Sequence, residues 1–286
     1  MLKIGAVMFF TTYSMQPAPL ARLLESRGFE SLWVPEHTHI PSTRKTPYPA
    51  GGPLIQPYYD LMDPFLALTA AATVTERLRL GTGIALLPQR DPIVTAKIVS
   101  TLDQLSAGRF LFGVGNGWNA EEMADHGTTD FKGRYRLARE RIEAMKVIWT
   151  QEKASYQGDL VRFGEMMAWP KPAQCPHPPV IVGGAFPYAA RRAIAYGDGW
   201  IPHASRQHYG DVTDFLPQFR EMVEAAGRDP ETLPVTVWGS KLQADDLKRL
   251  RDRGVARVVL QLKTANADVV LPALDNFAKL IAQLRD

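Results

Sequence analysis

The stretch from 78 to 118 constrains the fold most, because it reads as strand, helix and strand in close succession. Residues 78–83 are typical of a short apolar strand that runs into a glycine-rich turn. Asp91 then precedes Pro92, which is the pattern of a helix N-cap followed by proline in the first turn. Residues 109–115 are apolar nearly throughout, as expected of a parallel strand that helices cover. Two strands joined by a helix of this length predict a right-handed βαβ unit whose strands end at one edge.

The same alternation repeats along all 286 residues. Strands are expected at 2–10, 31–35, 78–83, 109–115, 179–183, 199–202, 235–238 and 255–262. Helices are expected at 18–27, 64–74, 91–108, 135–149, 188–196, 212–226, 244–253 and 269–284. Eight strand–helix units predict a (β/α)8 TIM barrel, forming a single domain over 1–286. An open doubly wound sheet is the structural alternative, but no GxGxxG motif follows the first strand.

Two segments interrupt this alternation. Residues 150–178 contain the segment ASYQGDLVRF and a proline-rich return, which together predict a hairpin excursion from the barrel. Residues 118–130 show no periodicity and are interpreted as a loop. The irregular segment 40–60 is long for a loop in a compact domain, and such loops usually serve function.

Composition excludes several classes of protein. The net charge is +3 and the charges are scattered, so no nucleic-acid partner is expected. The single cysteine, Cys175, lies in a proline-rich loop and rules out a disulfide framework or a cysteine-rich metal site. The N-terminal segment MLKIGAVMFF is too short for a membrane span and has no cleavage pattern, so we expect a cytoplasmic protein without a membrane partner.

The strand ends of a barrel meet at one mouth, where active sites lie. Glu36 is the only obvious carboxylate among them, whereas a glycosidase needs two. His37 and His39 form a His-x-His pair that raises a metal-dependent hydrolase as an alternative. Such a site needs further ligands, and His203 is the only other histidine at a strand end, so we expect no metal.

Gly183 and Gly184 lead from the fifth strand into a helix. A backbone without Cβ atoms can approach a phosphate closely, and a helix N-terminus supplies amides and a partial positive charge. A Gly-Gly turn can also simply end a strand. The pattern is therefore consistent with an anionic organic cofactor, without proving one.

Several separated motifs resemble the luciferase-like monooxygenase superfamily, in particular its branch of probable coenzyme F420-dependent oxidoreductases. They are, in chain order, SLWVPEHTHIP, ERLRLGTGIALLPQRDPIVTAKIVSTLDQLSAGRFLFGVGNGW, the PKP-to-PPVIVGG return and RRAIAYGDGW. The resemblance covers essentially the whole chain. It implies a (β/α)8 barrel, commonly a homodimer, that uses FMN or F420.

The resemblance also implies catalytic roles. His37 matches a histidine near the reactive ring face, to which proton transfer or stabilisation of an intermediate is assigned, and an imidazole suits proton traffic near neutral pH. Glu36 stands where many relatives carry aspartate and is a second catalytic candidate. One departure is Trp118, because relatives that oxidise a sugar phosphate carry a glutamate directly after the strand-four glycines. A role as a sugar-phosphate dehydrogenase is therefore in doubt.

The cofactor-binding residues implied by the resemblance lie at three strand ends. They are Gly83 and Ile84, joined in the family by a non-proline cis peptide that backs the ring; Asn116 and Gly117; and the phosphate loop Gly183, Gly184 and Ala185. We predict a cis bond between Gly83 and Ile84, with a trans turn glycine as the alternative.

The expected function is that of an F420-dependent oxidoreductase, which transfers a hydride between the deazaflavin C5 carbon and a small organic substrate. An FMN-dependent monooxygenase is the alternative within the family, and a non-catalytic flavin- or deazaflavin-binding protein is the alternative from another class. Pocket specificity is assigned to loops 38–59 and 119–131. Tyr48, Tyr58 and Tyr59 either anchor the first of these loops or line the pocket, and Trp118 either caps the mouth or stacks on substrate.

Overall fold

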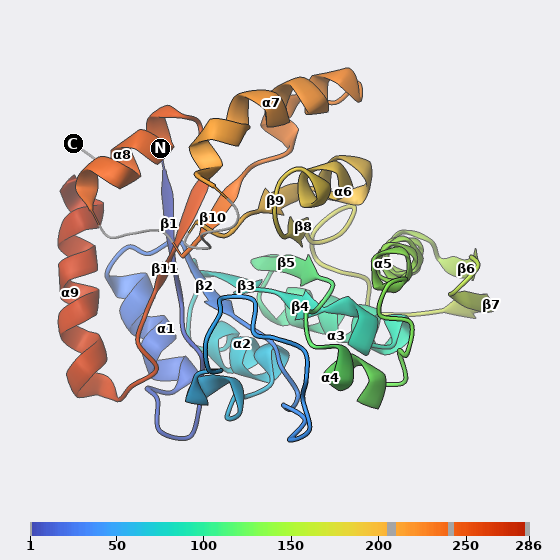
Figure 1. Ribbon diagram of the computed structural model, residues 1–286, viewed down its shortest axis with the longest axis horizontal. Coiled ribbons are helices and arrows are strands. Elements are labelled where there is room, and N and C mark those ends of the chain that lie inside the picture. Colours follow the sequence, from blue (N-terminus) through green and yellow to red (C-terminus); the bar gives the residue numbers. More distant parts are fainter. Residues whose placement is uncertain (1, 205–209, 240–242, 284–286) are drawn as a thin grey trace.

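A ring of parallel strands forms the centre of the molecule (Figure 1). The computed structural model describes residues 2–204, 210–239 and 243–283. The strands follow the spatial order β10, β11, β1, β2, β3, β5, β8 and β9, and parallel bridges from Trp200 to Val235 and from His203 to Trp238 join the two ends. The strands are β1 (Lys3–Val7), β2 (Ser31–Val34), β3 (Arg79–Thr82), β5 (Phe110–Gly115), β8 (Val180–Gly183), β9 (Gly199–Ile201), β10 (Thr236–Trp238) and β11 (Arg257–Gln261). The predicted eight-stranded barrel is confirmed.

Helices cover the outside of the ring. They are α1 (Pro17–Ser26), α2 (Pro64–Ala72), α3 (Pro92–Leu105), α5 (Arg134–Thr150), α6 (Tyr188–Tyr196), α7 (Val212–Ala225), α8 (Ala244–Asp252) and α9 (Ala267–Gln283). The predicted start of α3 is confirmed, because the Asp91 side chain accepts a hydrogen bond of 2.8 Å from the amide of Val94. Such a cap typically stabilises a helix by about 1 kcal/mol. Position 284, where the last helix was expected to end, lies outside the described residues.

The interior of the barrel is packed around Trp33. This fully buried side chain lies in a cluster with Val7, Leu111, Ile181, Ile201 and Val259. Its indole nitrogen donates to Ser31 Oγ at 2.8 Å. A Cβ added at Gly81 would come within 2.6 Å of Trp33 Cδ2, so glycine is required where the indole meets β3. The centre of the barrel is therefore a solid core, and function is confined to its rim.

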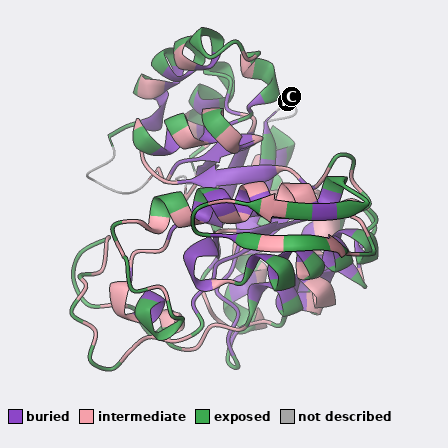
Figure 2. Cartoon of the chain, turned by 90° about the vertical axis from the view of Figure 1, so that its right-hand side faces the viewer, coloured by how far each residue is buried: buried purple, intermediate pink, exposed green. Residues whose placement is uncertain are grey.

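The predicted excursion is a hairpin of β6 (Lys153–Gln157) and β7 (Arg162–Met167), which pair antiparallel on the outer side of the barrel (Figure 2). Glu140 of α5 holds its turn, because one carboxylate oxygen accepts from the amides of Leu160 at 2.7 Å and Val161 at 3.1 Å. That the whole chain forms a single domain stays a prediction.

The interpretation of 118–130 as a loop was wrong, since residues Ala120–Asp125 form a short helix, α4. The Asn119 side chain caps it by accepting from the amide of Glu122 at 3.4 Å. Glu121 and Glu122 lie in the first turn, where the helix dipole favours negative charge. Six residues are too few to show helical periodicity, but Asn119 followed by Glu122 is the spacing of a capping box and is a signal that could have found the helix.

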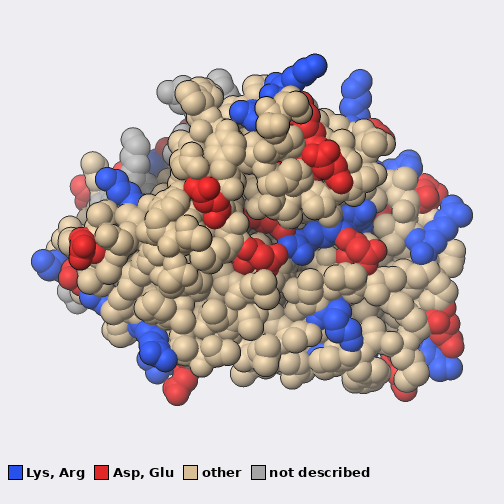
Figure 3. Space-filling view, turned by 90° about the horizontal axis from the view of Figure 1, so that it is seen from below, with Lys and Arg blue, Asp and Glu red and all other residues tan. Residues whose placement is uncertain are grey.

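Short elements complete the chain: a two-residue strand β4 (Ala85–Leu86) beside β5, and the 3-10 turns η1 (Gln56–Tyr58), η2 (Leu87–Gln89) and η4 (Pro230–Thr232). Basic and acidic side chains are interspersed on the face seen in Figure 3. In the described part of the chain, no helix is both long enough and apolar enough to cross a membrane.

Candidate active site

A rim of close backbone contacts joins the strand ends at which the cofactor residues were predicted. The peptide bond between Gly83 and Ile84 is cis, as predicted. The Ile84 side chain packs on the inner barrel cluster, next to Trp238. A Cβ at Gly183 would come within 2.9 Å of Ile84 Cδ1, and one at Gly115 would overlap the same atom. The glycines of β5 and β8 therefore make room for Ile84, and the contact of Gly83 and Ile84 with a cofactor stays a prediction.

His37, directly after β2, makes the main polar contacts at this rim. Its Nδ1 lies 2.6 Å from Oε2 of Glu122, and the two side chains are only 5% and 0% exposed. On the other side of the ring, the Trp118 indole nitrogen donates to His37 Nε2 at 3.2 Å. An indole N–H can only donate, so Nε2 must accept, and the proton of the neutral ring belongs on Nδ1. Glu122 thus receives the Nδ1–H bond, and the imidazole is held in one orientation and one tautomer.

Sequence reasoning found His37 and Trp118 but missed Glu122. The carboxylate is 85 positions from the histidine and belongs to the unpredicted helix α4. Glu122 also accepts from the Thr38 amide at 3.1 Å through its other oxygen. Burial of such a charge is costly unless it is paired, and here every contact comes from the segment that carries His37. Helix α4 therefore builds the site together with β2.

Aromatic rings surround the imidazole of His37. Tyr58 and Trp118 make edge contacts with it, at centroid distances of 5.2 and 5.5 Å. Tyr48 lies against both of these rings, at 5.4 Å from Tyr58 and 5.8 Å from Trp118. Tyr59, by contrast, is exposed. Two of the three candidate tyrosines in loop 38–59 thus form, with Trp118, a wall of aromatic rings beside His37.

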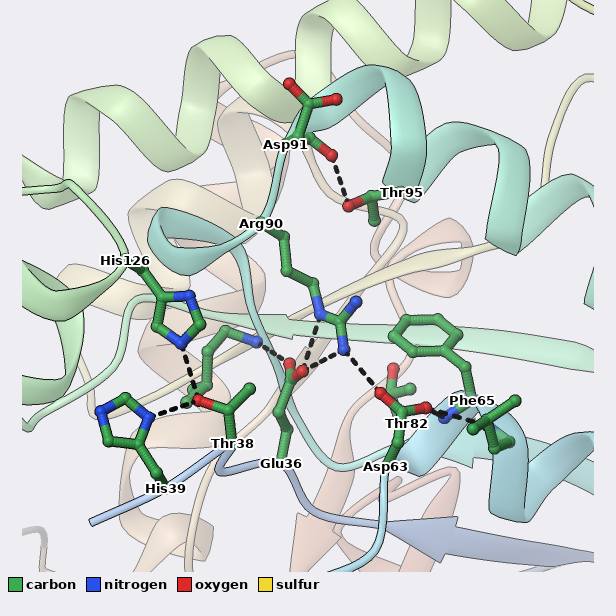
Figure 4. Close-up of polar contacts among 12 residues, drawn as sticks. Glu36, Thr38, His39, Asp63, Phe65, Thr82, Arg90, Asp91, Thr95 and His126 are labelled. Atoms are coloured by element: carbon green, nitrogen blue, oxygen red, sulfur yellow. Dashed lines mark hydrogen bonds and ion pairs between the residues drawn. The ribbon is translucent and has the colours of Figure 1, made fainter. Parts of the chain in front are cut away.

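Glu36 is engaged in a different network (Figure 4). Its carboxylate accepts from the amide of Leu86 at 2.6 Å and from Arg90 Nε at 2.7 Å, and Arg90 also reaches Asp63 at 3.3 Å. Burial disfavours the charge of Arg90, but its bonds to Glu36 outweigh this and raise its pKa. These contacts bind the end of β2 to the loop after β3. A catalytic role for Glu36 stays a prediction, and its observed contacts are those of a positioning group.

Helix α4 also holds the loop that follows His37. Glu121 accepts from the amide of Lys45 at 2.9 Å and from the hydroxyl of Thr46 at 2.6 Å. The bond from Thr46, with help from backbone amides, lowers the pKa of Glu121 to about 2. The Thr38 hydroxyl lies 2.9 Å from His39 Nδ1 and 2.7 Å from His126 Nε2, as Figure 4 shows.

The metal alternative has no further support. His37 and His39 diverge, the first to Glu122 and the second to Asp125 at 3.0 Å. Across the described ranges, no group of three histidine, cysteine, aspartate or glutamate side chains could hold a metal ion.

The predicted phosphate loop lies on the other side of the rim, between β8 and α6. Gly184 has φ of +128°, which only glycine adopts readily. The amide of Gly184 donates to the Ile201 carbonyl at 3.3 Å, so this amide is not available to a ligand. The amides of Ala185 and Phe186 have no partner among the described residues. These amides and the glycine cradle fit an anionic phosphate.

Arg192 adds positive charge to this loop. Its Nη2 lies 3.7 Å from the position of a Cβ on Gly184, and its buried Nε has no hydrogen-bond partner among the described residues. Gly117, whose carbonyl accepts from Arg134 Nε at 3.3 Å, lies at the neighbouring strand end beside Asn116. One side of the mouth thus brings together four of the predicted cofactor-binding residues: Asn116, Gly117, Gly183 and Gly184. Their contacts with a cofactor stay predictions.

Comparison with known proteins shows one family. The family model described as luciferase-like monooxygenase matches residues 18–279. An uncharacterized protein of Mycobacterium tuberculosis is 41% identical over 288 residues, which cover 97% of this chain and 98% of that protein. The F420-dependent hydroxymycolic acid dehydrogenase of the same organism is 32% identical over 74% of this chain and 55% of its own length.

Two more distant matches extend this picture. The FMNH2-dependent dimethylsulfone monooxygenase of Pseudomonas putida is 34% identical over 48% of this chain and 38% of its own length. Among solved structures, the monooxygenase RslO1 from Streptomyces bottropensis superposes with a TM-score of 0.79 at 20% identity, and the alignment covers 100% of both chains. At that identity the likeness shows the fold alone.

Proposed function

Because the chain belongs to the luciferase-like monooxygenase family, whose members are flavin- or F420-dependent oxidoreductases or monooxygenases, we propose that it is an F420-dependent oxidoreductase acting on a small organic substrate. The observation that carries this proposal is the buried pair of His37 and Glu122 at the barrel rim. It lies among strand ends whose glycine cradle and spare amides fit a phosphate-bearing cofactor. A bound deazaflavin would supply the ring carbon that exchanges a hydride with the substrate.

The chain's own contribution is proton transfer and orientation. When an alcohol is oxidised, its hydroxyl loses a proton as its carbon loses a hydride. Nε2 of His37 carries the lone pair that can take this proton, and Glu122, on the other ring nitrogen, fixes the orientation of the ring. The positive charge that forms on the imidazole is balanced by the Glu122 carboxylate 2.6 Å away. In the reverse direction, the same nitrogen returns the proton.

Trp118 shapes access to this proton acceptor. Its indole nitrogen donates a hydrogen bond to His37 Nε2 at 3.2 Å, so a substrate hydroxyl must share or replace that bond. Tyr48, Tyr58 and Trp118 exclude water around the imidazole, which strengthens its interaction with Glu122. The aromatic rings in contact with the imidazole suit an uncharged alcohol or carbonyl group at the reacting position.

Fluorescence titration of the purified apo-protein with F420 and with FMN tests the proposal. We expect saturable binding of F420 and weaker binding of FMN. Tighter binding of FMN, together with oxygen-dependent turnover, would favour the monooxygenase alternative, which the FMNH2-dependent relative supports. Binding without turnover of any alcohol, aldehyde or ketone would favour a non-catalytic binding protein.

The family resemblance also supports a homodimer as a proposal. Light scattering of the purified protein tests it, since a monomeric mass at micromolar concentration would contradict the dimer.

A further inference from the structure

A cationic groove lies between α5 and α6, outside the barrel rim. These two helices are neighbours in Figure 1. The groove has a volume of about 480 Å³ and is lined by Tyr135, Arg136, Arg139, Tyr188, Arg192 and Tyr196. The lining thus combines three guanidinium groups with three phenol rings. The proposed chemistry at His37 makes no use of this groove.

The positive charges of the groove are poorly balanced. Arg139 pairs with Glu143 at 3.0 Å. Arg136 and Arg192 form no ion pair with any residue that the structure describes. Burial lowers the pKa of the nearby Arg134, and the charge of Arg192 lowers it further. Like charges gathered without a counter-ion favour an anion at the same place.

The Tyr135 ring orders one guanidinium group of the groove and one beside it. The Arg192 guanidinium lies over the Tyr135 ring at 4.4 Å from its centroid, and Arg134 lies over the same ring at 4.2 Å. Stacking on the ring leaves the N–H groups at the edge of the Arg192 guanidinium plane able to donate, which is the geometry that receives a carboxylate. Arg134, in contrast, already donates to Gly117, Phe131 and Tyr135. Arg136 and Arg139 are three positions apart on α5, so they lie on neighbouring turns of one face. Their spacing suits a chain with more than one carboxylate.

Arg192 connects the groove to the phosphate loop. It lines the groove, and its Nη2 is also 3.7 Å from the position of a Cβ on Gly184. Its buried Nε, without a described partner, adds a donor at this junction. A ligand whose phosphate sits on the amides after Gly184 would therefore enter the groove if it continued beyond the phosphate.

We propose that the groove between α5 and α6 binds an acidic, carboxylate-bearing extension of the cofactor beyond its phosphate. The proposal rests on the proposed function and deepens it, because it distinguishes the two cofactors. FMN ends at its phosphate, whereas F420 carries a lactyl group and a glutamyl chain beyond it. The groove therefore selects the deazaflavin with its acidic chain.

The test compares three probes: F420 with its glutamyl chain, the same deazaflavin phosphodiester without glutamates, and FMN. Wild-type protein is expected to bind the first most tightly, with an affinity that falls most steeply with added salt. Arg136→Gln is expected to weaken binding of full-length F420 by roughly 3- to 10-fold, as for one partly exposed charge pair, and Arg136→Glu by more. Both variants should leave FMN binding within about two-fold of wild type, since FMN does not reach Arg136.

Lys132→Gln is the matched control, since it removes an exposed positive charge near the start of α5 from a residue that does not line the groove. Unchanged thermal unfolding of Arg136→Gln shows that the fold is intact. Equal losses for all three probes, or no loss for full-length F420, would overturn the groove proposal while leaving the proposed function in place. Failure of wild-type protein to bind any of the three would overturn both.

Discussion

The two sides of the barrel mouth treat their polar groups in opposite ways. On the His37 side, the imidazole and its carboxylate are paired within the protein: Nδ1 with Glu122, Nε2 with Trp118, and Glu122 again with the Thr38 amide. Around Gly184, donors are left over: the Arg192 Nε and two backbone amides lack partners in the described chain. Buried polar groups are normally satisfied, so leftover donors mark a place for a ligand. We therefore propose that the side around His37 is formed before any ligand binds, whereas the side around Gly184 is completed by the cofactor.

The largest effect is expected on the prebuilt side. His37→Ala should lower turnover by roughly 10²–10⁴, the usual contribution of general acid–base catalysis, because no other described imidazole shares its position. The affinity for cofactor should stay within a few-fold. Single-turnover rates with any accepted alcohol or ketone measure the first effect, and fluorescence titration measures the second. Full activity would assign the proton transfer to another group.

Glu122→Gln should come next, with turnover lowered by roughly 10–10³, because the amide cannot balance the imidazolium charge and can present an N–H to Nδ1. Glu122→Asp should recover part of the rate. Glu121→Gln is the matched control, since it removes the neighbouring carboxylate of α4, which contacts Thr46 and not His37. If Glu121→Gln and Glu122→Gln reduced turnover equally, the effect would belong to the folding of α4 and not to the pair with His37.

On the anion-binding side, Gly184→Val should weaken cofactor binding by about 1–3 kcal/mol, because a side chain there crowds the phosphate and disturbs its donors. The new Cβ would come within 3.1 Å of the Ala189 Cβ, at a φ that valine does not favour. Gly164→Val in the hairpin is the control, because a Cβ there meets nothing within 4 Å. Equal dissociation constants for wild type and Gly184→Val would place the phosphate elsewhere.

The smallest effect concerns the loop held by α4. The folded-state pKa of Glu121 is lowered to about 2, so its stabilising bonds to Thr46 are present above its ordinary pKa and are lost as pH falls toward 2. The stability difference between wild type and Glu121→Gln should therefore be constant at pH 5–7 and shrink at lower pH. Urea midpoints across this range measure it. A difference that grows on acidification would contradict the assignment.

The sequence predicted the barrel, the hairpin and the cis bond after Gly83, since each has a local signature: alternating apolar segments, turn residues and a characteristic motif. The features that the sequence did not predict share a cause, because each depends on contacts between residues far apart in the chain. Glu122 meets His37 across 85 positions, and its helix is too short to show periodicity. The groove is lined by Arg136 and Arg192, which lie on two different helices. In a sequence, an arginine on an exposed helix face is normally interpreted as a solvated charge.

The state of His37 before any cofactor binds decides whether this ring can accept a proton as proposed. Nitrogen-15 NMR of the histidine-labelled apo-protein at neutral pH measures this state, with His37→Ala to identify the signals. We predict that the neutral form of the His37 ring carries its proton on Nδ1 and accepts at Nε2, and that Glu122→Gln weakens this preference while Glu121→Gln preserves it. A proton on Nε2 in wild-type protein would contradict a site that is formed before the cofactor binds.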